Sequence, residues 1–123
     1  MKRVLVVERD SLQRELISEW LRGSGVQILS ADSAADGAEV DAILIDVTCQ
    51  QQAHETLASW RRAHPRAEIV LASGRFSRGD MANDAMAARF GVTRILAKPF
   101  TRKDLWAALN LHAASPTAPD RRP

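Results

Sequence analysis

Four short apolar runs in this sequence each lead into a side chain that could take part in phosphoryl or metal chemistry. The runs span residues 4–7, 42–45, 69–72 and 95–97, and the side chains that follow them are Glu8, Asp46, Ser73 and Lys98. A short run that is apolar throughout is typical of a strand buried on both faces of a parallel sheet. Ligands bind outside the carboxyl ends of such strands. Two acids, a hydroxyl and an amine at that edge predict a phosphoryl or metal site.

The segments between the strands must position these groups, and the first of them has helical spacing. Leu12, Leu16 and Trp20 recur every four residues, with Ile17 and Leu21 on the adjacent ridge. Asp10 can cap the start of this helix, with Gln13 reaching back, and Gly23 can close its end.

The rest of the chain alternates between strands and helices in the same way. A second strand is expected at residues 26–29, and residues 32–39 predict only a short helix or a turn. Three more helices are expected, and the first of them bears Ala53, Leu57 and Trp60. The second begins at Ser77 with Asp80 and bears Met81, Ala85 and Ala88. The third begins at Thr101 with Asp104 and bears Leu105, Ala108, Leu109 and His112. Such alternation predicts an α/β fold with a parallel sheet and helices on both faces.

Composition limits the classes of protein that the chain can belong to. The 123 residues suit one domain, expected at residues 1–113, and the proline-rich residues 114–123 predict a disordered tail. No apolar run reaches the roughly 18 residues of a membrane span, and the amino terminus does not resemble a signal peptide. The single cysteine, Cys49, fits a reducing compartment, so a cytoplasmic location is expected. A net charge of +2 gives no strong argument for a nucleic-acid partner.

The ends of the strands, taken together, resemble a known family. The matching stretches are Val-Leu-Val-Val-Glu8, Ile-Leu-Ile-Asp46, Leu-Ala-Ser73 and Ala-Lys98-Pro99-Phe100. They resemble the receiver domain of bacterial response regulators, which act in two-component signalling, and the likeness runs from about residue 2 to residue 112. The resemblance implies a flavodoxin-like fold with five parallel strands in the order 2-1-3-4-5. It also implies a cis peptide bond between Lys98 and Pro99.

The resemblance assigns a role to each of the clustered residues. Asp46 would be the phosphoacceptor, receiving a phosphoryl group from a histidine kinase or phosphotransfer protein. Lys98 would bind one phosphoryl oxygen and Ser73 another. Glu8, Asp46 and the backbone carbonyl of Thr48 would hold Mg²⁺, which neutralises charge as the group moves. At most, such a domain catalyses transfer to its own aspartate, so we do not expect a conventional enzyme.

One departure from the family pattern affects the metal site directly. The second acid of the family's acidic pair is here Arg9, which removes a carboxylate and adds a cation. We therefore expect Mg²⁺ binding to be weak or absent. Arg9 could pair with Asp46 or Glu8 and stand in for the metal, and we favour this interpretation. In the alternative, Arg9 points into solvent and Asp10 becomes a ligand.

Further departures concern signalling. Ile95 occupies the position of an aromatic ring that switches with Ser73 in the family, and a branched isoleucine is stiff. The interval between the second and third strands is short, so a shortened second helix is expected. Trp106, on the last helix, is a candidate for a partner surface. A homodimer through the fourth helix, fifth strand and fifth helix is the assembly that the family suggests.

The sequence leaves two functions open. In the first, the chain is an atypical single-domain receiver that signals by protein–protein interaction, with impaired Mg²⁺-dependent phosphorylation at Asp46. In the second, it is a phosphorylation-competent phosphoacceptor in a histidine kinase phosphorelay. The expected partners are a histidine kinase or phosphotransfer protein and a downstream protein. We expect no nucleic-acid or membrane partner.

Overall fold

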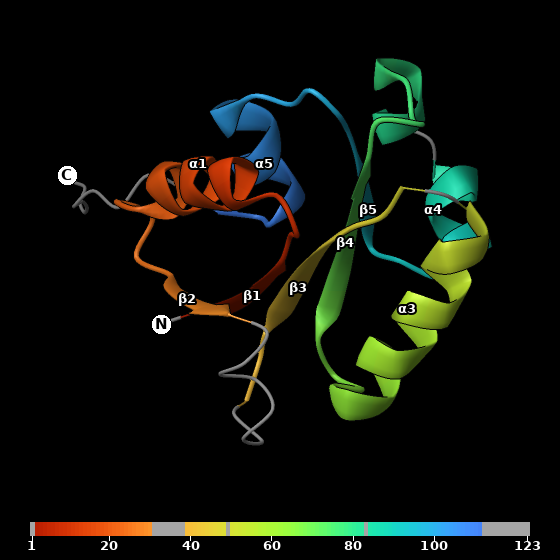
Figure 1. Cartoon of the computed structure of the whole chain (residues 1–123), viewed down its shortest axis with the longest axis horizontal. Helices are drawn as coiled ribbons and strands as arrows, with labels where there is room; N and C mark the ends of the chain where they lie inside the picture. The colour runs from red at the N-terminus through yellow and green to blue at the C-terminus, as the bar shows by residue number, and fades with distance from the viewer. Residues whose placement is uncertain (1, 31–38, 49, 83, 112–123) are drawn as a thin grey trace, which may run out of the picture.

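The computed structural model describes residues 2–30, 39–48, 50–82 and 84–111, and Figure 1 shows their arrangement. Five parallel strands form one sheet in the order β2-β1-β3-β4-β5. The strands are β1 (Arg3–Val7), β2 (Gln27–Ser30), β3 (Ala42–Asp46), β4 (Glu68–Ser73) and β5 (Arg94–Ala97). The helices are α1 (Ser11–Leu21), α3 (Gln50–Ala63), η1 (a 3₁₀ helix, Arg78–Ala82), α4 (Asp84–Phe90) and α5 (Arg102–Ala108). The predicted α/β class and strand order are confirmed.

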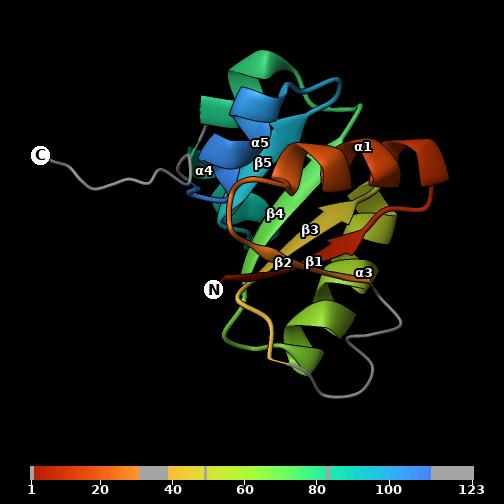
Figure 2. The same cartoon turned by 90° about the vertical axis from the view of Figure 1, so that its left-hand side faces the viewer.

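The sheet separates two hydrophobic cores, because successive side chains of a strand point to opposite faces. On one face, Val4 and Val6 of β1 pack with Ile17 of α1 and Leu105 of α5. On the other face, Leu5 packs in a cluster that also contains residues of α3 and α4. Figures 1 and 2 show α1 and α5 on one side of the sheet and α3 on the other. The prediction of helices on both faces is therefore confirmed.

Some predictions fall on residues that the structure does not describe. The shortened second helix, expected at residues 32–39, lies almost wholly in the gap 31–38. Cys49, His112 and the expected disordered tail at residues 114–123 also lie outside the described residues. Among the helices of the described residues, none has the length and hydropathy that crossing a membrane requires.

The sequence left open which of the two apolar ridges of α1 faces the sheet, and the structure shows that it is the ridge of Ile17 and Leu21. Ile17 and Leu21 are buried, whereas Leu12 is 75% exposed and Leu16 is 40% exposed. Successive helical residues are about 100° apart, so a helix that turns Ile17 and Leu21 to the sheet turns Leu16 away from it. The predicted cap is confirmed, since Asp10 Oδ1 accepts hydrogen bonds from the backbone N–H groups of residues 12 and 13. Two large apolar side chains consequently face solvent on α1.

The connection between β4 and β5 also differs from the single helix that was predicted. A 3₁₀ turn, η1, precedes α4, and only Asp84–Phe90 is α-helical. The carboxylate of Asp80 accepts hydrogen bonds from the N–H and the hydroxyl of Ser77, at 2.8 and 3.3 Å. This local pairing holds residues 77–80 in a turn, so the α-helix starts later than the capping pattern indicated. Gly91 follows α4 with a φ of 69°, a left-handed conformation that suits glycine.

Candidate functional site

The predicted site residues do gather at the carboxyl edge of the sheet. Asp46 and Ser73 are the last residues of β3 and β4, while Glu8 and Lys98 directly follow β1 and β5. The strands are aligned so that they end close to one level, with the last Cα pairs being Val7↔Ile45, Asp46↔Ala72 and Ser73↔Ala97. Parallel pairing in this register delivers two carboxylates, a hydroxyl and an ammonium group to one edge.

Lys98 is the centre of the site. Its Nζ lies 2.7 Å from Asp46 Oδ1 and 2.8 Å from Glu8 Oε1, so one ammonium group joins two carboxylates. The backbone N–H of Lys98 donates to the carbonyl of Ser73 at 3.0 Å, which fixes the start of its side chain beside β4. The Lys98–Pro99 peptide bond is cis, as the family resemblance implied.

The three charged groups are largely withdrawn from water. Side-chain exposure is 3% for Glu8, 16% for Asp46 and 22% for Lys98. Burial by itself lowers the pKa of the Lys98 ammonium, but the hydrogen bonds and charges of Asp46 and Glu8 outweigh it. The pKa of Lys98 is therefore raised above its usual value. The ammonium group therefore stays charged at neutral pH and joins the two acids.

In the loop after β1, hydrogen bonds hold Glu8 in place, and Asp10 caps the start of α1. The second oxygen of Glu8, Oε2, accepts the backbone N–H of Asp10 at 3.2 Å. Arg14 of α1 donates from Nη1 to the Glu8 carbonyl at 2.8 Å. This contact could not be predicted from the sequence, because Arg14 lies on a helix whose solvent face also carries other charges. Asp10 itself caps α1, so its carboxylate faces the helix start.

The favoured interpretation of Arg9 is wrong in this structure. Arg9 is exposed, and within the described residues it forms no ion pair or hydrogen bond. Both carboxylates are instead bound to Lys98. The physical reason is geometric: Arg9 follows the buried Glu8 in the loop, so its side chain leaves the chain on the solvent side. Asp10 does not take the place of the missing acid either, because it caps α1.

The remaining predicted residues have more ordinary surroundings. Ser73 is 2% exposed, and its Oγ accepts the N–H of Arg75 at 3.1 Å. Ile95 is 2% exposed within the core on the α3 face. Thr48 is exposed, and its hydroxyl donates to Gln52 Oε1 at 2.8 Å. Their predicted roles in metal binding and switching stay predictions.

Trp106 contributes to the packing of α5 on α1. Its ring N–H donates to the carbonyl of Trp20 at 2.7 Å, and the guanidinium of Arg102 lies 4.6 Å from the ring centroid. The hydrogen bond of the half-buried ring therefore helps to hold α5 against α1. Its predicted part in a partner surface stays a prediction.

The residues present fit a magnesium ion poorly. Within the described part of the chain, no group of three or more His, Cys, Asp or Glu side chains is arranged to hold a metal. The two available carboxylates already share an ammonium group, whereas Mg²⁺ requires near-octahedral oxygen ligands and favours negative charge. The expectation of weak or absent Mg²⁺ binding stays a prediction that needs measurement.

The sequence is similar to parts of two known regulatory proteins. No family model matches the chain. It is 28% identical over 120 residues to Transcription factor SKN7 of Candida albicans, covering 92% of this chain and 21% of that protein. It is 26% identical over 112 residues to Transcriptional regulatory protein GltR of Pseudomonas aeruginosa, covering 86% of this chain and 46% of that protein. The chain thus spans less than half the length of these relatives.

The fold of the chain is similar to that of solved response-regulator structures. Chemotaxis response regulator CheY4 of Vibrio cholerae has a TM-score of 0.70 at 23% identity, covering 89% of this chain and 97% of that one. A CheY-like receiver domain protein from Methanospirillum hungatei has a TM-score of 0.69 at 20% identity, covering 89% and 91%. The chain therefore has the fold of a response-regulator receiver domain. More particularly, it has the CheY-like form of that fold, with Asp46 at the end of β3.

Proposed function

We propose that this chain acts in two-component signalling as an atypical receiver. It binds a histidine kinase or phosphotransfer protein and a downstream partner, and its Mg²⁺-dependent phosphorylation at Asp46 is impaired. Receiver domains are signalling domains, and both the fold and the edge of the sheet support this function.

One observation carries the proposal of impaired phosphorylation. Among the described residues, Glu8 and Asp46 alone contribute carboxylates to the cluster around Lys98. The next residue, Arg9, faces solvent, and Asp10 is held as the cap of α1. The defect we propose is therefore a missing ligand, not a blocking cation. Losing one of three acids weakens a magnesium site because affinity depends on the number and charge of its ligands.

A second candidate function, the phosphorylation-competent phosphoacceptor, has its own support. The Asp46 carboxylate could attack the phosphorus of a phosphohistidine, and the bond to imidazole nitrogen would break with its electron pair leaving on that nitrogen. Lys98, already 2.7 Å from Asp46, could then bind a phosphoryl oxygen. Ser73 ends the adjacent strand and could donate its hydroxyl proton to another oxygen. These groups provide charge and hydrogen bonds without any further residue.

The exposed face of α1 is our candidate for the kinase-binding surface. In the described part of the chain, Leu12 and Leu16 are the exposed large hydrophobic residues. Leu16 also lines a groove of about 360 Å³. The other residues of this lining are Gln13, Trp20, Lys98, Pro99 and Phe100. An apolar helix face next to a groove is suited to a partner helix. Because Lys98 lines the groove, a partner bound there would lie beside the Asp46 cluster.

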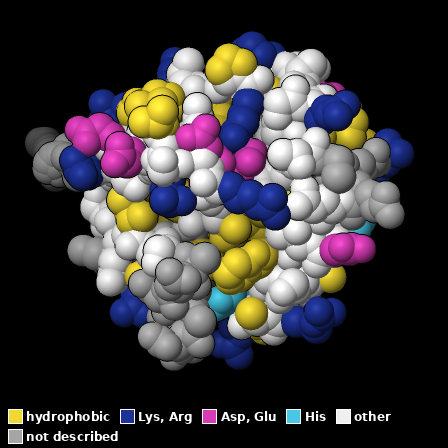
Figure 3. Space-filling view, viewed as in Figure 1, with side chains coloured by type: hydrophobic (Ala, Val, Ile, Leu, Met, Phe, Trp, Pro, Cys, Tyr) yellow, Lys and Arg dark blue, Asp and Glu magenta, His cyan; other side chains and the backbone are white. Residues whose placement is uncertain are grey.

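Other predicted partners and properties remain proposals. Figure 3 shows basic side chains scattered over the visible face and interleaved with acidic ones, which favours no nucleic-acid stripe there.

On the predicted dimer face, Arg78 of η1 bonds both carboxylate oxygens of Asp104 in α5, at 3.1 and 3.3 Å. Size-exclusion chromatography with light scattering tests the homodimer. A cytoplasmic location is still expected from the sequence.

Intact mass spectrometry after incubation with acetyl phosphate and Mg²⁺ tests the proposed function. We expect little or no addition of a phosphoryl group to folded protein under conditions that label a typical receiver. Complete labelling of the wild type, absent in Asp46→Ala, would replace our proposal with the phosphorelay function.

Restoring the missing acid tests the reason for the defect. Arg9→Asp should strengthen Mg²⁺ binding about tenfold or more, measured by tryptophan fluorescence, because one carboxylate ligand is gained. Arg66→Asp, an exposed arginine with the same change of charge, is the matched control. If both variants bind Mg²⁺ equally well, the gain is general electrostatics and our explanation fails.

A further inference from the structure

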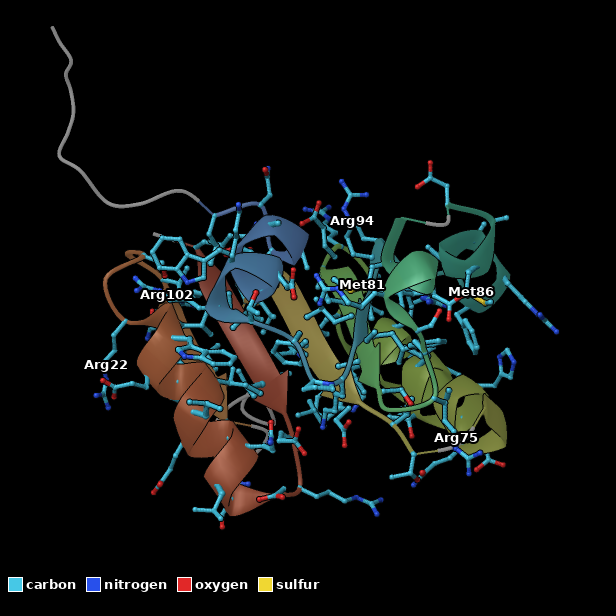
Figure 4. The ribbon with its side chains drawn as sticks, turned by 90° about the horizontal axis from the view of Figure 1, so that it is seen from above. Arg22, Arg75, Met81, Met86, Arg94 and Arg102 are labelled. Carbon is cyan, nitrogen blue, oxygen red and sulfur yellow. The ribbon has the colours of Figure 1, made fainter. Side chains whose placement is uncertain are left out.

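A cavity of about 350 Å³ lies on the α3 side of the sheet, next to Ser73. It is lined by Val47, Ala53, Ser73, Arg75, Phe76, Asp80, Met86, Arg89 and Phe90. These residues come from the loop after β3, α3, the end of β4, the loop between β4 and η1, η1 and α4. In Figure 4, Arg75 and Met86 both lie on the side of the sheet that carries α3 and α4. The volume is within the range of small-molecule sites.

The walls of the cavity are mainly apolar and partly aromatic. Phe76 and Phe90 pack edge to face, with ring centroids 5.7 Å apart. His54 stacks behind Phe90 at 5.6 Å, which holds that ring in place. Val47 and Ala53 are buried. A flat apolar group could therefore lie against fixed rings instead of displacing mobile side chains.

Three donor groups at the cavity bind no acceptor among the described residues, and two of them belong to the exposed side chains of Arg75 and Arg89. The guanidinium groups of Arg75 and Arg89 form no ion pair or hydrogen bond with other described residues. The hydroxyl of Ser73 accepts the N–H of Arg75, but it donates to no described residue. Ser73 is only 2% exposed, and a buried hydroxyl normally finds an acceptor. These donors suit a ligand that supplies acceptor oxygens.

The charges around the cavity indicate the kind of anion. The lining contains two arginines and one acid, Asp80, whose carboxylate already accepts a hydrogen bond from Ser77. The net charge of the lining is therefore +1, which a monoanion neutralises and a dianionic phosphate would exceed. A guanidinium fork also matches a planar carboxylate in two parallel hydrogen bonds.

We propose that this cavity binds a small aromatic carboxylate. The aromatic part lies against Phe76, Phe90 and Met86, and the carboxylate receives hydrogen bonds from Arg75, Arg89 and Ser73. Binding at this site does not require phosphorylation of Asp46, so it stands or falls separately from the proposed signalling function.

The test is a titration of the isotope-labelled chain with 2-naphthoate, followed by amide shifts in NMR. We expect saturable shifts centred on residues 73–76 and 86–90. Arg75→Gln and Arg89→Gln should each weaken binding about tenfold, the effect of losing one charge-assisted hydrogen bond. Arg62→Gln, at an exposed arginine of α3 that does not line the cavity, is the matched control and should bind as the wild type does.

Three comparisons can overturn the proposal. The neutral analogue 2-naphthalenemethanol should bind at least tenfold more weakly, and equal binding would show an apolar site without anion recognition. Inorganic phosphate should compete poorly, and tighter binding of phosphate would contradict the carboxylate assignment. Asp46→Ala should bind 2-naphthoate normally, and loss of binding in that variant would place the anion at Lys98 instead. No saturable shift with 2-naphthoate also refutes the site.

Discussion

Replacing Lys98 by methionine is the most direct test of the charged cluster. The substitution keeps an unbranched side chain of similar length and removes the ammonium group that lies 2.7 Å from Asp46 and 2.8 Å from Glu8. The two carboxylates are then left facing each other without a cation. We expect the free energy of unfolding to fall, since Glu8 is almost fully buried and cannot recover hydration.

The size of the loss follows from the exposure of the three groups. Removing one partner of a buried ion pair costs about 3–5 kcal/mol. Lys98 is 22% exposed and Asp46 is 16% exposed, so water partly compensates on one side. We therefore expect a loss of about 3 kcal/mol at neutral pH. Lys103→Met, at an exposed lysine of α5, is the matched control and should change stability by less than about 0.5 kcal/mol.

Urea denaturation across a range of pH is the assay. The folded-state pKa of Lys98 is raised above its ordinary value of 10.5, so its stabilising effect is fully present below that value and is lost as pH rises through the raised pKa. The difference between wild type and Lys98→Met should stay constant from neutral pH to about 10 and shrink only above it. A difference no larger than that of Lys103→Met would refute the reasoning. So would a difference that disappears below pH 10.

The remaining predictions concern α1 and α5. Ile17→Ala should lower the free energy of unfolding by about 2–4 kcal/mol, while Leu16→Ala, at a side chain 40% exposed, should cost much less in the same urea assay. Thr101→Ala removes the acceptor for the Asp104 N–H at 3.0 Å and should lower the free energy of unfolding by about 1 kcal/mol. Thr101→Ser, which keeps a capping hydroxyl, is the control and should leave the free energy of unfolding nearly unchanged. Asp10→Asn keeps a good cap and should leave Mg²⁺ affinity unchanged in fluorescence titrations. A fall in affinity would show that Asp10 is a ligand.

The fold could be predicted because its signals are local and agree with one another. Apolar runs closed by polar residues gave the described strands, and the Thr101–Asp104 capping box is present as expected. The orientation of α1 could not be predicted from its sequence, and this has a definite cause. Its sequence carries two overlapping apolar ridges, and spacing alone does not say which ridge meets the sheet. That choice depends on the packing of α1 against β1 and α5, which no single helix encodes.

The candidate site was predictable in its membership and less so in its contacts. Strand ends fixed where Glu8, Asp46, Ser73 and Lys98 would lie. The partner of each charge depended on the direction of long side chains in a loop, which residue type does not determine. Arg9 and Lys98 both could have reached the two acids, and only Lys98 does so in the structure. The cavity beside Ser73 was also missed, because its lining comes from segments far apart in sequence.

Ser73 links the proposed signalling site with the proposed carboxylate site. Its hydroxyl has one proton, and the N–H of Arg75 already occupies one of its acceptor positions. In the phosphoacceptor function the hydroxyl would donate a hydrogen bond to a phosphoryl oxygen on Asp46. With a carboxylate in the cavity, it would donate its hydrogen bond to that carboxylate instead. The two hydrogen bonds exclude each other. If both sites operate, an aromatic carboxylate must therefore oppose the Ser73 contact to a phosphoryl group, even though it does not touch Asp46.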